Sequence, residues 1–143
     1  MLRMAVLGFP GFEGKKLIFN ARCESALEKS MFRDSILRRR IVIPASWFYE
    51  WNPRKEKNTF CRNDRAILFM AGFSRRYEDG EHFVIITTAA NVSMEPVHDR
   101  MPLILEQQEI AEWMFSNAKT EGFLQKTPCL LERKTEYEQL SLF

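Results

Sequence analysis

The stretch Ile41-Val42-Ile43-Pro44-Ala45-Ser46-Trp47-Phe48-Tyr49-Glu50-Trp51 decides how the rest of this chain is arranged. It opens with three β-branched residues, as a buried strand does. Pro44 lacks an amide proton, so it ends strand pairing or confines the strand to a sheet edge. Glu50 stands between Tyr49 and Trp51, and a carboxylate flanked by aromatic rings is expected to be partly desolvated and suited to proton transfer. On this pattern alone, the plainer interpretation is that Glu50 is the solvent-facing residue of an alternating strand.

Length and composition predict one globular domain over residues 1–143. The chain is 45% hydrophobic and 28% charged, which is ordinary for a domain large enough to bury a core. Its formal net charge is +2, so nucleic-acid binding would depend on a local basic patch. Residues 134–143 are expected to form a mobile C-terminal tail.

Cysteine usage and hydropathy indicate a cytoplasmic protein without metal or cofactor. The cysteines are odd in number, scattered, and without the C-x-x-C spacing of a zinc site: Cys23, Cys61 and Cys129. Such usage suits a reducing compartment. No apolar run reaches transmembrane length, and the first residues do not resemble a signal peptide.

Hydrophobic periodicity predicts an α+β fold dominated by a largely antiparallel sheet. Short, turn-rich connections separate the expected strands, which is typical of antiparallel pairing. Besides the central stretch, strands are expected at residues 16–19, 59–62, 66–73, 82–88 and 103–105.

Two segments show helical spacing, residues 24–40 and 106–118. The first is expected to break near Ser30, whose hydroxyl would cap the second piece. The chain beyond residue 119 is expected to be less regular. Arg38, Arg39 and Arg40 either complement a helix C-terminus or form a phosphate-binding patch, and both interpretations stay open.

Four polar islands follow the ends of expected strands, where folds often place reactive groups. They are residues 20–22, 48–51, 87–91 and 98–102. Each is a weak signal alone, and a single loop histidine such as His98 is more often a surface residue. Together they bring an amide, a carboxylate, an imidazole and two arginines, which could form one anion-binding, acid–base site.

These islands occur in an order and spacing that resemble the SRAP family, the SOS response-associated peptidases. The resemblance runs from about Arg3 to Leu105 and is carried by Asn20-Ala21-Arg22-Cys23-Glu24, Phe32-Arg33-Asp34, Pro44-Ala45, Phe48-Tyr49-Glu50-Trp51, Thr87-Thr88-Ala89-Ala90-Asn91 and His98-Asp99-Arg100-Met101-Pro102. It implies a barrel-like antiparallel sheet with flanking helices. It also implies a role in the DNA damage response: binding of single-stranded DNA at abasic sites, covalent cross-linking to the lesion, and self-removal of the initiator Met. A nucleoid-associated location would follow.

The resemblance assigns Asn20, Glu50 and His98 to the opened deoxyribose of an abasic site. A carboxylate can shuttle the protons that capture of an aldehyde requires. A neutral amide can hold a sugar hydroxyl, and an imidazole can assist ring opening near neutral pH.

The same resemblance places DNA around this trio. Arg22 and Arg100 would hold flanking phosphates, and Trp51 would offer a face to a base or sugar. Thr88 and Asn91 are further expected DNA-binding residues.

Two departures from the family pattern bear on activity. The family's nucleophile is a cysteine directly after the initiator Met, whereas Leu2 stands second here and the start resembles an interior family segment. An experimental truncation, a misplaced start codon or a truncated paralogue would look the same. Trp47 stands where the family usually has a small residue, which affects the pocket's size. Cys23 has no adjacent free amine and is a poor substitute nucleophile.

Two functional hypotheses therefore remain. The chain is either an SRAP-type lesion enzyme or a non-catalytic module that recognises damaged or single-stranded DNA. A covalent adduct on a denaturing gel separates them, and as written the chain is expected to form no stable cross-link.

The last five residues suggest a further partner. Gln139, Leu140, Leu142 and Phe143 resemble the peptide by which bacterial repair proteins bind the β sliding clamp, with apolar anchors and one register-setting amide. The alternative is an apolar C-terminus that docks on its own domain.

Overall fold

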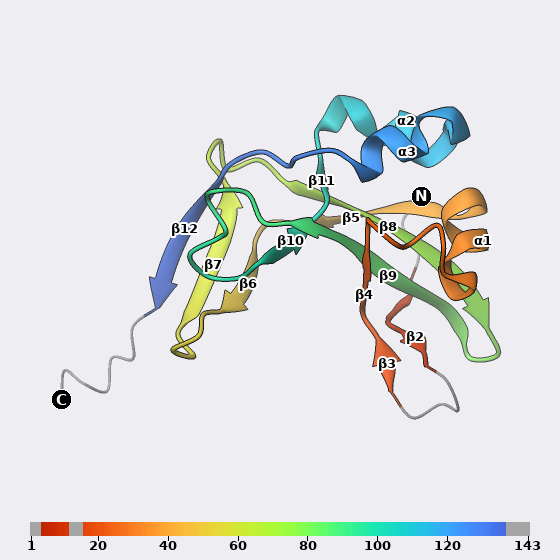
Figure 1. Ribbon diagram of the computed structural model, residues 1–143, viewed down its shortest axis with the longest axis horizontal. Helices are drawn as coiled ribbons and strands as arrows, with labels where there is room; N and C mark the ends of the chain where they lie inside the picture. The colour runs from red at the N-terminus through yellow and green to blue at the C-terminus, as the bar shows by residue number, and fades with distance from the viewer. Residues whose placement is uncertain (1–3, 12–15, 137–143) are drawn as a thin grey trace.

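The computed structural model describes residues 4–11 and 16–136. Figure 1 shows a long central sheet with a smaller sheet beside one end of it. The helices lie along the central sheet, away from the smaller sheet. The fold is α+β and its strands are mostly antiparallel, as predicted. In the part of the chain that the structure describes, the sheets do not close into a barrel.

Strands β8 (Leu68–Tyr77) and β9 (Gly80–Ala89) form the hairpin at the centre of the larger sheet. Gly80 lies at the turn with φ of 124°, a conformation that glycine adopts without steric cost. Alternate residues of β9 from His82 to Thr88 are buried. This is expected when one face of the strand packs on the core and the other face is less covered. The predicted strands at 66–73 and 82–88 are the cores of these two elements.

Strand β9 pairs on its outer side with two short parallel strands, β1 (Val6–Leu7) and β4 (Asn20–Arg22). On its inner side β8 and β9 separate, and β10 (Arg100–Pro102) and β11 (Ile104–Leu105) occupy the gap. Leu103 closes this insertion: its N–H donates to Ile86 O at 2.9 Å, and its carbonyl accepts from Ala71 N–H at 2.8 Å. Strand β9 is therefore the element on which distant motifs meet. A separate hairpin pairs β2 (Phe9–Pro10) with β3 (Leu17–Ile18).

The central stretch of the sequence forms two strands in two different sheets. Strand β5 (Arg40–Ala45) pairs only with β8 among the described residues, so Pro44 lies on an edge strand as predicted. After Ser46 and Trp47 the chain enters β6 (Phe48–Trp51), which joins β7 (Lys57–Arg62) and β12 (Leu131–Glu136) in the three-stranded sheet.

Two hydrophobic clusters fill the interior. The first lies under the helices and includes Phe9, Ala21, Phe32, Ile36, Phe73, Ile86, Leu103, Trp113 and Phe123. The second lies between the two sheets and consists of Phe60, Leu68, Met70, Met94, Val97, Met101, Ile104 and Leu131, with Phe48 and Ile85 packed against it. Burial of this apolar surface is the main favourable term in folding.

The helices differ from the prediction at their ends. Helix α1 is Ser30–Arg38, its N-cap is Lys29, and the predicted capping role of Ser30 is wrong because Ser30 is already helical. The second predicted helix is divided into η2 (Gln107–Glu109), α2 (Ile110–Phe115) and η3 (Asn117–Lys119). Beyond residue 119 the chain is more regular than expected, with α3 (Thr120–Leu124) and β12. Residues 134–136 of the predicted tail belong to β12.

The three consecutive arginines have structural partners rather than a common exposed face. Arg38 and Arg39 pair with Asp34, and Arg39 also donates to Ser74 O at 2.9 Å. Arg40 is buried, and its guanidinium donates to the carbonyls of Ile36 and Trp113. These contacts favour the helix-terminus interpretation over the phosphate-binding patch.

A pH dependence follows from His82, which is buried in β9. Its Nδ1 lies 2.7 Å from Gly8 O and its Nε2 lies 2.7 Å from Asp79 Oδ1. The carbonyl of Gly8 and the carboxylate of Asp79 raise the pKa of His82 above its ordinary 6.5. The raised value means that the protonated form stabilises the fold fully below pH 6.5, and that this stabilisation is lost as pH rises through the folded value. Urea unfolding should therefore show a decline above pH 6.5 that is weaker in His82→Gln, and an equal decline in both would contradict the assignment.

Candidate DNA-lesion site

Three of the four polar islands meet at the C-terminal end of β9. Arg22 of β4 is in register with Thr87, and Thr87 is in register with Pro102 of β10 on the other side. The chain after β4 stays attached, because Cys23 N–H donates to Thr87 O at 2.9 Å. Residues 20–22, 87–91 and 98–102 are thus joined by backbone hydrogen bonds at one point of the sheet.

Two residues of the predicted trio lie on strand faces that border the second hydrophobic cluster, and the third follows one of its members in the chain. Asn20 is in register with Ile85, which packs against that cluster. His98 follows Val97, a buried member of it. Glu50 lies two residues from Phe48, on the same face of β6. Strand register thus puts Asn20 and Glu50 on faces that border one cluster, while His98 adjoins it through its chain neighbour Val97.

Strand alternation gives Asn20 and Arg22 their orientation. Ala21 and Cys23 belong to the first cluster, so the intervening Asn20 and Arg22 point to the opposite face of the sheet. Both side chains are exposed. This face carries an amide and a guanidinium that solvent, and hence a ligand, can reach.

Glu50 is not held between aromatic rings. Successive side chains of a strand point to opposite faces, so Tyr49 and Trp51 lie on the other side of the sheet from Glu50. Its cross-strand partner is Asn58, which is buried. Glu50 Oε2 accepts a hydrogen bond from Trp51 N–H at 3.1 Å. The expected flanking by aromatic rings is thus corrected, and Trp51 faces away from the cluster that borders Glu50.

The loop geometry orients His98. Its Nδ1 accepts from Arg100 N–H at 3.1 Å and lies 3.3 Å from Asp99 Oδ1. In the neutral ring, an accepting Nδ1 leaves the proton on Nε2. The side chain is 41% exposed, so Nε2–H is in a position to donate to a ligand.

Arg100 is tied to Glu24 and does not form a free rim cation. Its Nη1 and Nη2 each donate to a carboxylate oxygen of Glu24 at 2.8 Å, and Nη2 also donates to Thr87 O at 2.9 Å. Hydrogen bonds from Arg100 lower the pKa of Glu24 to about 2, and Glu24 in turn raises the pKa of Arg100. Only 15% of the Arg100 side chain is exposed. The sequence pattern does not single out Glu24 as a site residue, because its partner Arg100 lies 76 positions away.

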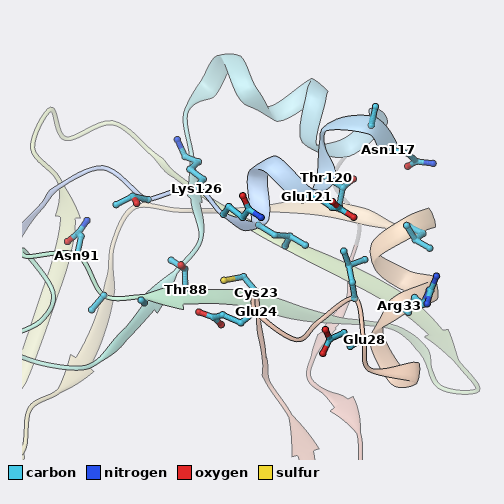
Figure 2. A pocket seen from close by; sticks show the side chains of 18 residues that line it. Cys23, Glu24, Glu28, Arg33, Thr88, Asn91, Asn117, Thr120, Glu121 and Lys126 are labelled. Carbon is cyan, nitrogen blue, oxygen red and sulfur yellow. The ribbon is translucent and has the colours of Figure 1, made fainter.

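Thr88 and Asn91 line a cavity of about 1220 Å³ on the side of the sheet that carries the helices. Figure 2 shows Cys23, Glu24 and Thr88 grouped on its floor, with Thr120, Glu121 and Lys126 opposite. The remaining lining comes mainly from the α1 region and residues 117–127. Asn20, Glu50 and His98 do not line this cavity.

Asn91 has a structural task that occupies its amide. Its Nδ2 donates to the carbonyls of Pro128 and Cys129 at 3.1 and 2.9 Å, and its Oδ1 accepts from Ser93 N–H at 3.0 Å. It therefore fastens the start of the His98 loop to the segment that leads into β12.

The cavity thiol is not activated. Burial is the largest cause that raises the pKa of Cys23 above its ordinary value, and a protonated thiol is a weak nucleophile. This environment agrees with the expectation that Cys23 is a poor substitute nucleophile.

Residues 4–11 and 16–136 contain no group of three or more His, Cys, Asp or Glu side chains placed to hold a metal ion. Over the same part of the chain, every helix is too short or too polar to cross a membrane.

Residues 10–141 match the model of the family described as SOS response associated peptidase (SRAP). The abasic site processing protein YoqW of Bacillus subtilis is 36% identical over 78% of this chain and 54% of that protein. The abasic site processing protein YedK of Escherichia coli is 32% identical over 73% of this chain and 50% of that protein. The chain thus spans about half the length of these curated relatives.

Solved structures show the same fold. A protein from Bordetella bronchiseptica superimposes with a TM-score of 0.77 and 27% identity, over 87% of this chain and 67% of that one. A protein from Bacteroides thetaiotaomicron gives a TM-score of 0.74 at 27% identity, over 87% of this chain and 60% of that one. The match to the family model covers most of the sequence and includes every polar island, so the chain belongs to the SRAP family.

Proposed function

We propose that this chain binds single-stranded DNA at abasic sites as part of the DNA damage response. The observation that carries the proposal is the meeting of residues 20–22, 87–91 and 98–102 at the end of β9, with Asn20 and Glu50 on faces that border the second cluster. Similarity to proteins named for abasic site processing supports the choice of lesion.

The chemistry of the trio suits a ring-opened abasic sugar. As the closed hemiacetal opens to the aldehyde, the Glu50 carboxylate accepts the proton of the C1 hydroxyl, and it returns that proton on closure. His98 Nε2–H donates a hydrogen bond to a sugar oxygen. Asn20 offers a neutral amide to a hydroxyl. A nucleotide without a base costs little to present to such a site, because no stacking is lost.

In this proposal Arg22 binds a DNA phosphate, while Arg100 stabilises the strand ends and does not contact DNA. Arg22 is exposed on the Asn20 face. The guanidinium of Arg100 donates hydrogen bonds to Glu24 and to Thr87 O, and these bonds hold the ends of β4, β9 and β10 together. This assignment revises the expectation that both arginines contact DNA alike.

Replacement of Arg22 by Gln should weaken binding of abasic single-stranded DNA about fivefold, or ~1 kcal/mol, by loss of one charge-assisted contact. The slope of log affinity against log salt should fall by about 0.7, the value for one phosphate of a single strand. Fluorescence anisotropy with a labelled oligonucleotide at several salt concentrations measures both. Arg76→Gln on exposed β8 surface is the matched control, and an equal effect of the two substitutions would refute the assignment.

The lesion-enzyme and binding-module hypotheses share this site and separate in one experiment. The chain is incubated with oligonucleotides carrying an abasic site and then resolved on a denaturing gel. If an adduct forms, and Glu50→Gln or His98→Gln slows its formation, the result supports cross-linking. Reversible binding without an adduct supports the binding module. Binding no tighter to abasic than to intact strands would contradict the lesion proposal.

Recruitment by a sliding clamp remains a separate proposal. Gln139, Leu140, Leu142 and Phe143 lie outside the described residues. Calorimetric titration of a bacterial β clamp with the full chain and with a chain lacking residues 139–143 tests it. We expect micromolar-range binding that the deletion abolishes, and equal binding by both chains would rule it out.

A further inference from the structure

The outer face of the three-stranded sheet carries a row of aromatic side chains that the trio does not use. Trp47, Tyr49 and Trp51 occur at alternate positions and point away from the second cluster. They are 51%, 49% and 52% exposed. In Figure 1 this sheet, made of β6, β7 and β12, stands beside the end of β9 and β10 where the polar islands meet.

The spacing of the rings fits an extended strand rather than a stacked one. The ring centroids of Trp47 and Tyr49 are 6.2 Å apart, and those of Tyr49 and Trp51 are also 6.2 Å apart. This separation is almost twice the ~3.4 Å rise per nucleotide of a B-form strand. The rings therefore match bases that are unstacked from one another, as in single-stranded nucleic acid bound on aromatic platforms.

The charges at this face match a phosphate backbone. Lys57 Nζ lies 4.5 Å from the centroid of the Tyr49 ring and 6.0 Å from that of Trp47. The turn between β6 and β7 presents exposed Arg54 and Lys55. Its shape is fixed by Asn52, whose Oδ1 accepts from the N–H groups of Arg54 and Glu56 at 3.0 and 2.9 Å.

Two carboxylates near this face already have hydrogen-bond partners. Glu56 Oε1 accepts from Asn52 Nδ2 at 3.0 Å, and Glu132 accepts from Arg65 at 2.8 Å. Glu50 lies on the opposite face of the sheet. Lys134, which is in register with Thr59 and thus with Tyr49, adds another exposed cation.

We propose that Trp47, Tyr49 and Lys57 form a stacking subsite for the unpaired bases that flank the lesion. The two rings take successive bases, and Lys57, which lies over the Tyr49 ring in the free protein, moves to the phosphate between them. The subsite extends the path of the single strand beyond Trp51. This inference rests on the proposed function, because it assumes that the same strand also reaches the trio.

The test compares two labelled oligothymidine strands, each with one central abasic site. In the second strand the flanking thymidines on both sides are replaced by abasic spacers, which keep the phosphates and remove the bases. We expect Trp47→Ala and Tyr49→Ala each to weaken binding of the first strand about tenfold, and to leave binding of the second unchanged. Trp47→Phe should retain most of the affinity because it keeps a ring. Phe115→Ala, which removes a 79% exposed aromatic from α2, is the control and should have no effect.

Fluorescence gives an independent result. In Trp51→Phe the remaining tryptophans are Trp47 and the fully buried Trp113, so stacked bases should quench the emission of Trp47 with the first strand only. The absence of quenching overturns the subsite.

The outcomes separate this inference from the proposed function. Salt-dependent binding that requires Arg22 but ignores Trp47 and Tyr49 overturns the subsite alone. Failure of the unaltered chain to bind either strand overturns both. Concentration-dependent self-association that Trp47→Ala abolishes, without change in DNA affinity, also overturns the subsite and assigns this face to a second copy of the chain.

Discussion

Replacement of Trp113 by Ala is expected to lower the free energy of unfolding by about 4 kcal/mol, as for other large aromatic residues removed from a core. Trp113 is fully buried, and its Nε1–H donates to Ile41 O at 2.8 Å. Its ring packs against Phe123 with centroids 6.0 Å apart, and the guanidinium of Arg40 lies over it. The side chain therefore joins α2 and α3 to β5, and its loss opens a cavity and removes this hydrogen bond. Urea unfolding measures the change.

Two further substitutions in α2 test why the loss of Trp113 lowers the free energy of unfolding. Trp113→Phe keeps a ring but loses the hydrogen bond, so an intermediate loss is expected. Phe115→Ala lies on the same helix and is exposed, so it should change stability by less than about 0.5 kcal/mol. A loss below about 1 kcal/mol for Trp113→Ala would show that the helices do not seal the first cluster.

Replacement of Arg100 by Met is expected to cost about 3 kcal/mol of stability, because it removes a largely buried guanidinium from several partners. The bonds lost are those to both oxygens of Glu24 and to Thr87 O. Since these bonds connect the ends of β4, β9 and β10, binding of single-stranded DNA should also weaken. The salt slope should change less than in Arg22→Gln, because Arg100 is paired internally.

Acid titration gives a signature specific to this pair. The pKa of Glu24 is lowered from 4.5 to about 2, so the pair contributes stability above pH 4.5 that is lost as pH falls toward 2. In Arg100→Met this loss should be shallower. Glu24→Gln is the matched variant, since it keeps an oxygen acceptor and removes the charge. An unchanged acid profile in both variants would contradict the role of the pair.

Much of the architecture was predictable from local pattern. Alternating and β-branched residues predicted β5, β7, β8 and β9, and Pro44 predicted an edge strand, because a missing amide proton is a property of the residue itself. The polar islands were found at strand ends by the change from apolar to polar residues. Helix ends and β12 were missed, since weak local preferences there are overridden by tertiary packing.

The neighbours of individual side chains were decided by tertiary structure. Tyr49 and Trp51 are adjacent to Glu50 in sequence, yet the two-residue period of a strand places them on the opposite face, where they join Lys57 instead. Arg100 meets Glu24 only because β9 brings β4 and β10 together. The sequence by itself determined which residue types stand at the strand ends. Strand register and sheet packing alone decided that three polar islands meet at the end of β9 and that Arg100 is withdrawn into an ion pair, because such contacts depend on segments far apart in the chain.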